Sequence, residues 1–464
     1  MEQMRWAYGI KEKRGPMGRC TPAPQSKDGV MNPIPFHQLP HMLYADPQGR
    51  IFEHPYFRMA GFSGAEPAPI TEGDLMELPE FSKLFFIPDC PPVGLDPETG
   101  AWEVIPHIEL EGKVTPLNAV AAFLEPGLVR THLPAADYGR KGYTLPMWAY
   151  TAVGFRQGAY WAAGFQIEKN HKWDPRNYDD RDLVLAIREY ERNQVTGPLV
   201  EHLKACATRN HCFAAKNLFL GRWEAPLPIS RTCNAACLGC LSLQPQGSCE
   251  ASHQRLSFTP SSEEVAAVAV RHLTHAPEPI VSFGQGCEGE PLTEWRLICD
   301  SIRRIRAETR QGTINLNTNG SRPEQIRKIA QSGLDSIRIS LNSALGERYH
   351  RYYRAKDYRF ADVVASIRVC QEQGLYTMLN YLIFPGITDQ ADELEALGGL
   401  IDKTGINFLH LKNLCIDPAY YLQKMPGTGA AGMGMRCLVN LLQKEFPEVE
   451  LGYFNQPVQR ASSV

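Results

Sequence analysis

The sequence predicts an α/β protein: a partial (β/α)6 barrel of the TIM type, preceded by an α+β N-terminal domain and followed by a short C-terminal extension. Two observations predict this fold class. After Arg222, short apolar stretches alternate with amphipathic stretches of helical period, as in parallel strands joined by crossover helices. Before Arg222, short apolar runs are interrupted by many prolines and glycines, and a helical period begins only near Asp180.

Each barrel element is predicted from its own pattern of apolar residues. Gly333 and Gly374 stand where helix C-terminal caps are expected, and the acidic pair after Ser262 suits the first turn of a helix. The predicted strands are 226–230, 279–283, 313–317, 336–341, 376–384 and 406–411, and the predicted helices are 261–275, 294–309, 323–332, 361–373 and 390–404. Six strands suit a barrel that stays open along one side, with ligands bound at the carboxyl ends of the strands.

Changes of composition divide the chain into four segments. Residues 1–30 form a polar tail that we expect to be disordered, 31–222 the N-terminal domain, 223–425 the barrel, and 426–464 an extension that caps or pairs with the barrel. The tail lacks the apolar core of a secretory signal. Translation from Met31 rather than Met1 is an alternative, because the patterned sequence begins there.

Composition narrows the classes of function. The formal net charge is -3, so no global basic field argues for a nucleic-acid partner. No apolar stretch has the roughly 18 residues that a membrane span needs. The 13 cysteines are scattered and do not follow the spacing of a small secreted domain. We therefore expect a cytoplasmic protein in which most thiols are free.

Three cysteines cluster directly after the first predicted strand: Cys233, Cys237 and Cys240. Three thiolates within eight residues can converge on one soft metal centre when the segment is an irregular loop. Three ligands would leave one iron of a [4Fe-4S] cubane free to bind a small molecule. A closed zinc site would need a fourth ligand, which His211, Cys212 or Cys249 could supply, so zinc and a plain electron-transfer cluster remain alternatives.

Polar motifs follow the next three predicted strands. The residues concerned are Glu288, Gly289, Glu290 and Pro291 after the second strand, Asn317 and Asn319 at the end of the third, and Arg338, Ser340 and Asn342 on the fourth. The last three alternate with apolar residues and so share one face of the sheet. A polar barrel interior indicates a bound ligand. The alternative for 288–291 is a glycine-rich turn that binds no ligand, and the alternative for the fourth strand is a half-solvated sheet face.

Together these motifs resemble the radical S-adenosylmethionine (radical SAM) superfamily over about 223–418. The resemblance implies that the three clustered cysteines ligate a [4Fe-4S] cluster whose open iron binds S-adenosylmethionine (SAM). It assigns 288–291 to the Gly-Gly-Glu-Pro motif that holds the methionine amino group. It assigns the fourth strand to contacts with the ribose hydroxyls and the carboxylate of SAM. It also implies that main-chain atoms near Phe384 and Pro385 border the adenine.

The sequence departs from the superfamily pattern at two positions. Glu288 replaces the first glycine of the Gly-Gly-Glu-Pro motif. Gly239 stands immediately before the third cysteine, where many members carry an aromatic residue that packs on adenine. The stacking surface would then come from elsewhere, such as Leu238 or a strand residue.

The resemblance also implies an activity. Reduction of the cluster would cleave SAM to a 5′-deoxyadenosyl radical that takes hydrogen from a substrate, either a peptide or protein or a small metabolite. The electron donor would be a ferredoxin or flavodoxin, and the N-terminal domain would select substrate or cover the open side of the barrel. The alternative is a non-catalytic iron–sulfur or zinc protein on a barrel scaffold.

Two further clusters fall outside these motifs. Cys206 and Cys212 precede the barrel, and with Cys90 or Cys249 they could hold an auxiliary cluster, although buried single thiols are commoner. The run 348–354 mixes tyrosines with basic residues. It could grip RNA or another anion, but a solvated helix face is the simpler interpretation.

Overall fold

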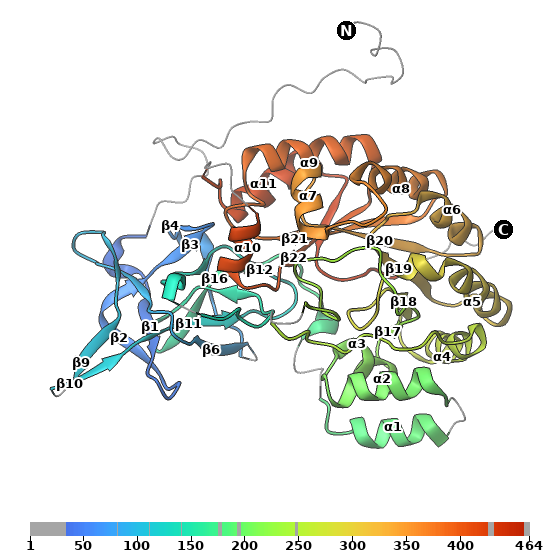
Figure 1. Ribbon diagram of the computed structural model, residues 1–464, viewed down its shortest axis with the longest axis horizontal. Coiled ribbons are helices and arrows are strands. Elements are labelled where there is room, and N and C mark those ends of the chain that lie inside the picture. The colour runs from blue at the N-terminus through green and yellow to red at the C-terminus, as the bar shows by residue number, and fades with distance from the viewer. Residues whose placement is uncertain are drawn as a thin grey trace, which may run out of the picture.

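The computed structural model describes residues 34–80, 82–110, 112–140, 142–174, 179–192, 196–245, 249–425 and 431–458. The N-terminal β-rich body lies at one end of the molecule and the α/β barrel at the other (Figure 1). The predicted tail 1–30 and the alternative start at Met31 lie outside the described residues. Among the described residues, no helix combines the length and hydropathy required to cross a bilayer.

The N-terminal body is built mainly from antiparallel strands. Its largest sheet has 11 strands. Seven of them lie in the order β12-β16-β15-β1-β2-β7-β8. In addition, β5 pairs with β16, β11 pairs with β1, and β6 and β14 pair with β11. The strands are β1 (His41–Ala45), β2 (Ile51–Met59), β3 (Gly61–Ser63), β4 (Glu66–Ala68), β5 (Leu75–Glu77), β6 (Lys83–Ile87), β7 (Val93–Leu95), β8 (Trp102–Val104), β9 (His107–Leu110), β10 (Lys113–Pro116), β11 (Asn118–Phe123), β12 (Leu128–Arg130), β13 (Leu133–Pro134), β14 (Tyr150–Thr151), β15 (Val153–Arg156) and β16 (Ala159–Gln166). Helices α1 (Leu183–Arg192), α2 (Pro198–Thr208) and α3 (Phe213–Phe219) follow them.

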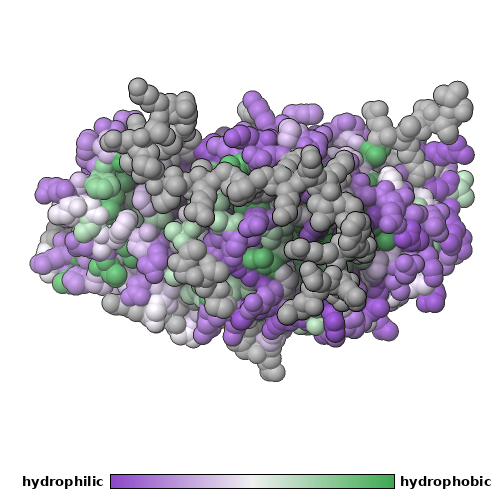
Figure 2. Space-filling model, turned by 90° about the horizontal axis from the view of Figure 1, so that it is seen from above, coloured by the Kyte–Doolittle hydropathy of each residue, from purple (hydrophilic) through white to green (hydrophobic). Residues whose placement is uncertain are grey.

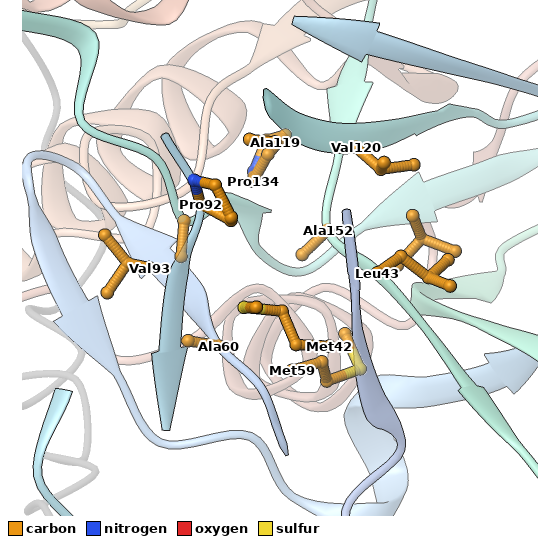
Figure 3. A pocket seen from close by; sticks show the side chains of 12 residues that line it. Met42, Leu43, Met59, Ala60, Pro92, Val93, Ala119, Val120, Pro134 and Ala152 are labelled. Atoms are coloured by element: carbon orange, nitrogen blue, oxygen red, sulfur yellow. The ribbon is translucent and has the colours of Figure 1, made fainter. Parts of the chain in front are cut away.

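A small cavity inside this sheet is lined by apolar side chains, among them Met42, Met59 and Val120 (Figure 3). Every residue that lines it is a methionine, leucine, alanine, proline or valine. Such a lining has no ionisable group with which to bind a charged ligand or a metal. This cavity therefore offers no catalytic or metal-ligating side chain.

The barrel is a seven-stranded parallel sheet in the order β17-β18-β19-β20-β21-β22-β23. Its strands are β17 (Glu224–Leu227), β18 (Ile280–Phe283), β19 (Thr313–Thr318), β20 (Ser336–Leu341), β21 (Tyr376–Ile383), β22 (Phe408–Asn413) and β23 (Glu450–Gly452). Its helices are α4 (Ser262–His275), α5 (Trp295–Glu308), α6 (Pro323–Gln331), α7 (Gly346–Tyr353), α8 (Phe360–Glu372), α9 (Ala391–Thr404), α10 (Pro418–Lys424) and α11 (Met435–Glu445). Six strands were predicted; the seventh comes from the C-terminal segment, which pairs with β22.

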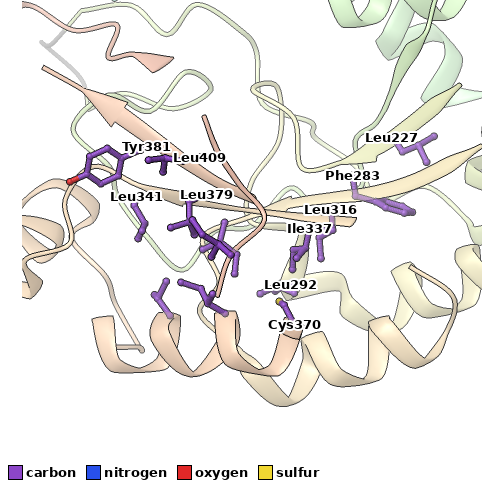
Figure 4. Packing of buried hydrophobic residues seen from close by; sticks show 14 of the residues in the cluster. Leu227, Phe283, Leu292, Leu316, Ile337, Leu341, Cys370, Leu379, Tyr381 and Leu409 are labelled. Carbon is purple, nitrogen blue, oxygen red and sulfur yellow. The ribbon is translucent and has the colours of Figure 1, made fainter. Parts of the chain in front are cut away.

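The two faces of this sheet have opposite character. Leu316, Ile337 and Leu379 are fully buried and face the helical layer, which includes Cys370 of α8 (Figure 4). Hydrophilic residues dominate the described surface at the barrel end of the molecule in the view from above (Figure 2). The strand residues that alternate with the buried apolar ones point into the barrel, which gives it a polar interior.

Helix α7 does not match the sequence prediction. The run 348–354 was interpreted as a solvated helix face, but Arg348, Tyr349, Tyr352 and Tyr353 are buried. Tyr349 and Tyr353 stack with ring centroids 4.3 Å apart. The solvated-face interpretation is therefore wrong for these residues, which pack in the barrel core.

The N-terminal body and the barrel are joined through Arg130, which is fully buried at the end of β12. Its guanidinium donates to the carbonyl oxygens of Tyr150 at 3.2 Å, Leu414 at 3.0 Å and Ile383 at 3.4 Å. The last two residues lie at the ends of β22 and β21. One side chain thus joins the N-terminal sheet to the carboxyl edge of the barrel.

The conservative substitution R130K tests this junction. Lysine keeps the charge but lacks the planar fork that reaches three carbonyl oxygens at once, so we expect a loss of stability of about 2–4 kcal/mol. Thermal unfolding measures it, with R303K on the exposed surface of α5 as the control. Equal melting temperatures for R130K and R303K would contradict this account of the junction.

Candidate active site

The three clustered cysteines lie on an irregular loop that follows β17, and all three are half-buried. The loop is held by the last turn of α7. Ala236 donates its amide to the carbonyl of Tyr353, and Leu238 donates to that of Tyr352, both at 3.0 Å. The exposed carbonyls of a helix C-terminus thereby fix the loop through its backbone and leave the thiol groups available.

The surroundings of Cys233 and Cys237 disfavour their thiolate forms. Burial raises the pKa of Cys233 to about 11, and the nearby Glu290 adds to the effect. Burial also raises the pKa of Cys237 well above its usual value, and the other two thiols contribute. Arg255 lies 3.4 Å from Cys240 Sγ through Nη2. A bound metal centre would supply the positive charge that these groups lack.

Glu288 is buried, and its carboxylate accepts four backbone amides. Oε2 accepts from Ile229 and Ser230, each at 2.8 Å. Oε1 accepts from Gly284 at 2.8 Å and Gln285 at 2.7 Å. Burial raises the pKa of Glu288 to about 7, while the four amides favour the charged form. The side chain joins the loop after β17 to the loop after β18.

Gly289 is required where these two loops touch. A Cβ atom on this residue would lie 1.9 Å from the carbonyl oxygen of Thr232. The close approach allows Gly289 to donate its amide to Ser230 at 2.7 Å, and Glu290 to donate to Thr232 at 2.8 Å. The sequence motif therefore runs alongside the cysteine loop, and Pro291 begins the short 3-10 helix Pro291–Glu294.

Glu290 is buried beside the end of β19. Oε1 accepts from Thr318 Oγ1 at 2.5 Å and from Leu292 N at 3.1 Å, and Oε2 accepts from Asn319 N at 2.9 Å. Burial raises its pKa to about 7. A carboxylate has about four acceptor positions, so one remains for a further donor.

Two asparagines connect the third strand to the neighbouring loops. Asn317 donates to the carbonyl of Gly284 at 3.0 Å. Asn319 donates through Nδ2 to Asn234 Oδ1 at 2.8 Å, which ties it to the cysteine loop. Asn234 was not singled out in the sequence, because a lone asparagine between cysteines carries no distinctive pattern.

The polar residues of the fourth strand share the barrel interior with β21 and β22. In the strand register, Arg338 pairs with Met378, and Ser340 pairs with Asn380. Arg338 donates through Nη1 to Asn455 at 3.0 Å, whereas its Nε atom is buried without a hydrogen-bond partner among the described residues. The Oδ1 atom of Asn380 is in the same state. Buried polar atoms without partners mark a position where a ligand would satisfy them.

Asn342 and Lys412 are two further polar residues near the same interior. Asn342, the last polar residue of the fourth-strand motif, is buried and donates to the carbonyl of Arg348 at 3.4 Å. Lys412 on β22 lies 4.8 Å from the Tyr453 ring, and burial with Arg338 nearby lowers its pKa to about 7. The fold brings Lys412 close enough to Arg338 for their charges to interact, although the strand register aligns Arg338 with Phe408 of β22.

The fold explains why a glycine, Gly239, stands before the third cysteine. A Cβ on Gly239 would lie 2.8 Å from the hydroxyl oxygen of Tyr352. Tyr352 reaches this place from α7, about 110 residues further along the chain. The side chain of a different element therefore fills the space beside the cysteine loop, so a larger residue at 239 would clash with it.

Comparison with known families identifies this region. Residues 227–397 match the model of the radical SAM superfamily. The chain contains a radical SAM domain. The matched range begins at the end of β17 and includes the cysteine loop, the 288–291 motif and the interior strands. A search of curated proteins finds no match to the chain.

Solved structures show a distant likeness to this chain. One is described as "Native anSMEcpe with bound AdoMet", with 14% identity, 50% of this chain and 63% of that chain covered, and a TM-score of 0.37. HydG, a maturase of the [FeFe]-hydrogenase, gives 16% identity, 60% and 63% coverage, and a TM-score of 0.35. SuiB of Streptococcus suis bound to its precursor peptide SuiA gives 10% identity, 54% and 52% coverage, and a TM-score of 0.37. At these values the likeness carries no argument about substrate.

The substitution G289A tests the contact between the two loops. The added methyl group forces the Thr232 carbonyl away and breaks two hydrogen bonds, so we expect a loss of about 2–3 kcal/mol. Thermal unfolding of the full chain measures it. The control is G399A, because a Cβ on Gly399 of α9 would meet no atom within 4 Å. If G289A melted at or above the temperature of G399A, the close packing described here would be wrong.

Proposed function

We propose that this chain is a radical SAM enzyme in which Cys233, Cys237 and Cys240 hold a [4Fe-4S] cluster. The observation that carries the proposal is the presence of three half-buried thiols on one loop at the carboxyl edge of β17, inside a radical SAM domain. Sulfur atoms that bind a single tetrahedral zinc ion lie about 3.8 Å apart. The three thiols do not form a group within 4.8 Å, a spacing that suits a larger centre.

When bound, the reduced cluster supplies the electron that cleaves SAM to methionine and a 5′-deoxyadenosyl radical, which takes a hydrogen atom from the substrate. The chain's own residues bind, orient and shield the reactants. Glu290 has one acceptor position left for the ammonium of SAM. Glu288 has none, since four amides occupy both its oxygens. Glu288 is therefore a positioning residue in this proposal, and Glu290 the contact.

The barrel interior supplies the remaining SAM contacts. Arg338 provides a guanidinium for the carboxylate of the methionine moiety, a pairing that suits its planar donors. Ser340 lies on the same strand and Asn342 directly follows it, within the segment assigned to the ribose hydroxyls. Asn317 and Asn319 border the loop that holds Glu290. The unpartnered Nε of Arg338 and Oδ1 of Asn380 support a polar ligand between β20 and β21.

The substrate is a peptide or protein or a small metabolite that enters the same interior. The N-terminal body shields the carboxyl edge of β21 and β22 through Arg130 and through Asn413, which bonds to the backbone of β12. This arrangement supports a role for the N-terminal domain in covering the site and selecting substrate. An external one-electron donor such as a ferredoxin or flavodoxin, in a reducing cytoplasm, completes the proposal.

The test is SAM cleavage by the full-length chain. After anaerobic reconstitution we expect about four irons per chain and, with dithionite and SAM, release of 5′-deoxyadenosine measured by liquid chromatography and mass spectrometry. C237A should abolish the product, because one ligand is lost. The control C299A removes a buried thiol on α5 and should retain it.

Intact SAM in the presence of a reduced cluster would contradict the proposal. So would a chain that binds zinc at the three cysteines and takes up no iron, since that result describes a non-catalytic metal protein on the same scaffold.

A further inference from the structure

A second group of soft metal ligands lies outside the cysteine loop. It consists of His202 and Cys206 on α2 and Cys287 in the loop after β18. One ligand atom from each residue lies within 4.8 Å of the other two, and it is the one such group of three among the described residues. Cys206 and Cys287 are separated by 81 positions in the sequence, so the fold brings them together.

The geometry of the helix explains the first pair. Residues four positions apart on an α-helix lie on the same face, so His202 and Cys206 point in the same direction. His202 Nε2 lies 3.5 Å from Cys206 Sγ. In a tetrahedral zinc site, Zn–S and Zn–N distances of about 2.3 and 2.05 Å place the nitrogen and sulfur atoms about 3.6 Å apart. The observed separation is that of two ligands of one ion.

The environment of the group also suits a metal. Cys206 and Cys287 are 2% and 4% exposed, so both thiols are removed from water. The ring of Phe258 packs edge-on against that of His202, with centroids 6.3 Å apart, and restricts the orientation of the imidazole. The amide of Asn210 approaches Cys206 Sγ at 4.0 Å and can donate to a thiolate. Buried sulfur with an amide donor nearby is the environment of a structural site.

Two further residues, Cys212 and His253, lie near this group of three. Cys212 is the N-cap residue of α3 and donates its amide to the carbonyl of Cys206 at 3.0 Å, which folds the chain back toward α2. Its thiol interacts electrostatically with those of Cys206 and Cys287. His253 interacts in the same way with Cys206 and His202. Either side chain could serve as the fourth ligand.

We propose that His202, Cys206 and Cys287, with Cys212 or His253, bind a single thiophilic divalent cation of the zinc type. The distance from His202 Nε2 to Cys206 Sγ suits two ligands of one ion, the Cys287 ligand atom lies within 4.8 Å of both, and thiolate with imidazole is the donor set that zinc prefers. This site replaces the auxiliary cluster suggested from the sequence, in which Cys206 and Cys212 were joined by Cys90 or Cys249. Cys90 packs elsewhere, in the apolar core around Ile87 and Tyr150.

The position of the ion gives it a structural role. Cys287 immediately precedes Glu288, and its carbonyl accepts the amide of Leu256 at 2.8 Å. An ion here would join α2, which lies before the barrel, to the loop that carries Glu288, Gly289 and Glu290. The metal site itself does not depend on the proposed function.

The experiment measures metal in a background without the clustered cysteines. The full-length variant C233A/C237A/C240A removes the competing thiols, and we expect it to bind about one zinc ion per chain by elemental analysis. Adding C206A or C287A should lower the zinc content at least about tenfold. Adding C299A, a buried thiol outside the group, should leave it unchanged, and circular dichroism checks the fold of each variant.

Cobalt substitution provides a second readout. We expect thiolate-to-cobalt charge-transfer absorption and the intense d–d bands of tetrahedral coordination, both lost in H202Q or C287A. Because His202 is only half-buried, H202Q tests the site even if a thiol variant fails to fold. Failure of the background variant to bind zinc, or zinc content unaffected by C206A, C287A and H202Q, would overturn the proposal. An iron–sulfur chromophore that persists in the background variant and disappears with C206A would also overturn it.

Discussion

The carboxylate of Glu288 is the interaction on which the arrangement of the site depends. Two parallel strands end side by side at β17 and β18, and beyond them the backbone amides have no strand partner. One buried carboxylate accepts four of these amides. An amide side chain of the same shape could not, since its nitrogen is a donor. The cysteine loop and the Gly-Glu-Pro segment are therefore held together before any cofactor binds.

The barrel then positions the other groups through the alternation of its strands. Residues such as Ile337 and Leu379 pack outward against the helices, and their sequence neighbours Arg338 and Asn380 point inward. The same alternation that builds the hydrophobic core thus lines the interior with polar groups. Arg130 and Asn413 join the edge where β21 and β22 end to the N-terminal body.

Much of the barrel and of the candidate site could be predicted from the sequence, because the patterns that indicate them are local. The cysteine spacing, the strand–helix alternation and the inward face of the fourth strand each span a few residues. The role of Glu288 could not be predicted, since two of its amide partners lie 58 and 59 positions away. The pairing of Cys206 with Cys287 was missed for the same reason. The pairing of the C-terminal segment with the barrel was predicted, and β23 confirms it. The tyrosines of α7 are interspersed with charged residues, as on a surface helix, so the sequence did not show that they are buried.

The central claim is that three protein sulfurs leave one iron of a cubane available to SAM. Electron paramagnetic resonance of the dithionite-reduced, anaerobically reconstituted chain tests it most directly, with spectra recorded before and after addition of SAM. A [4Fe-4S] signal whose g-values shift when SAM is added, because the vacant iron gains a ligand, is the expected result. A spectrum that SAM leaves unchanged, or the absence of any cluster signal, would contradict the account.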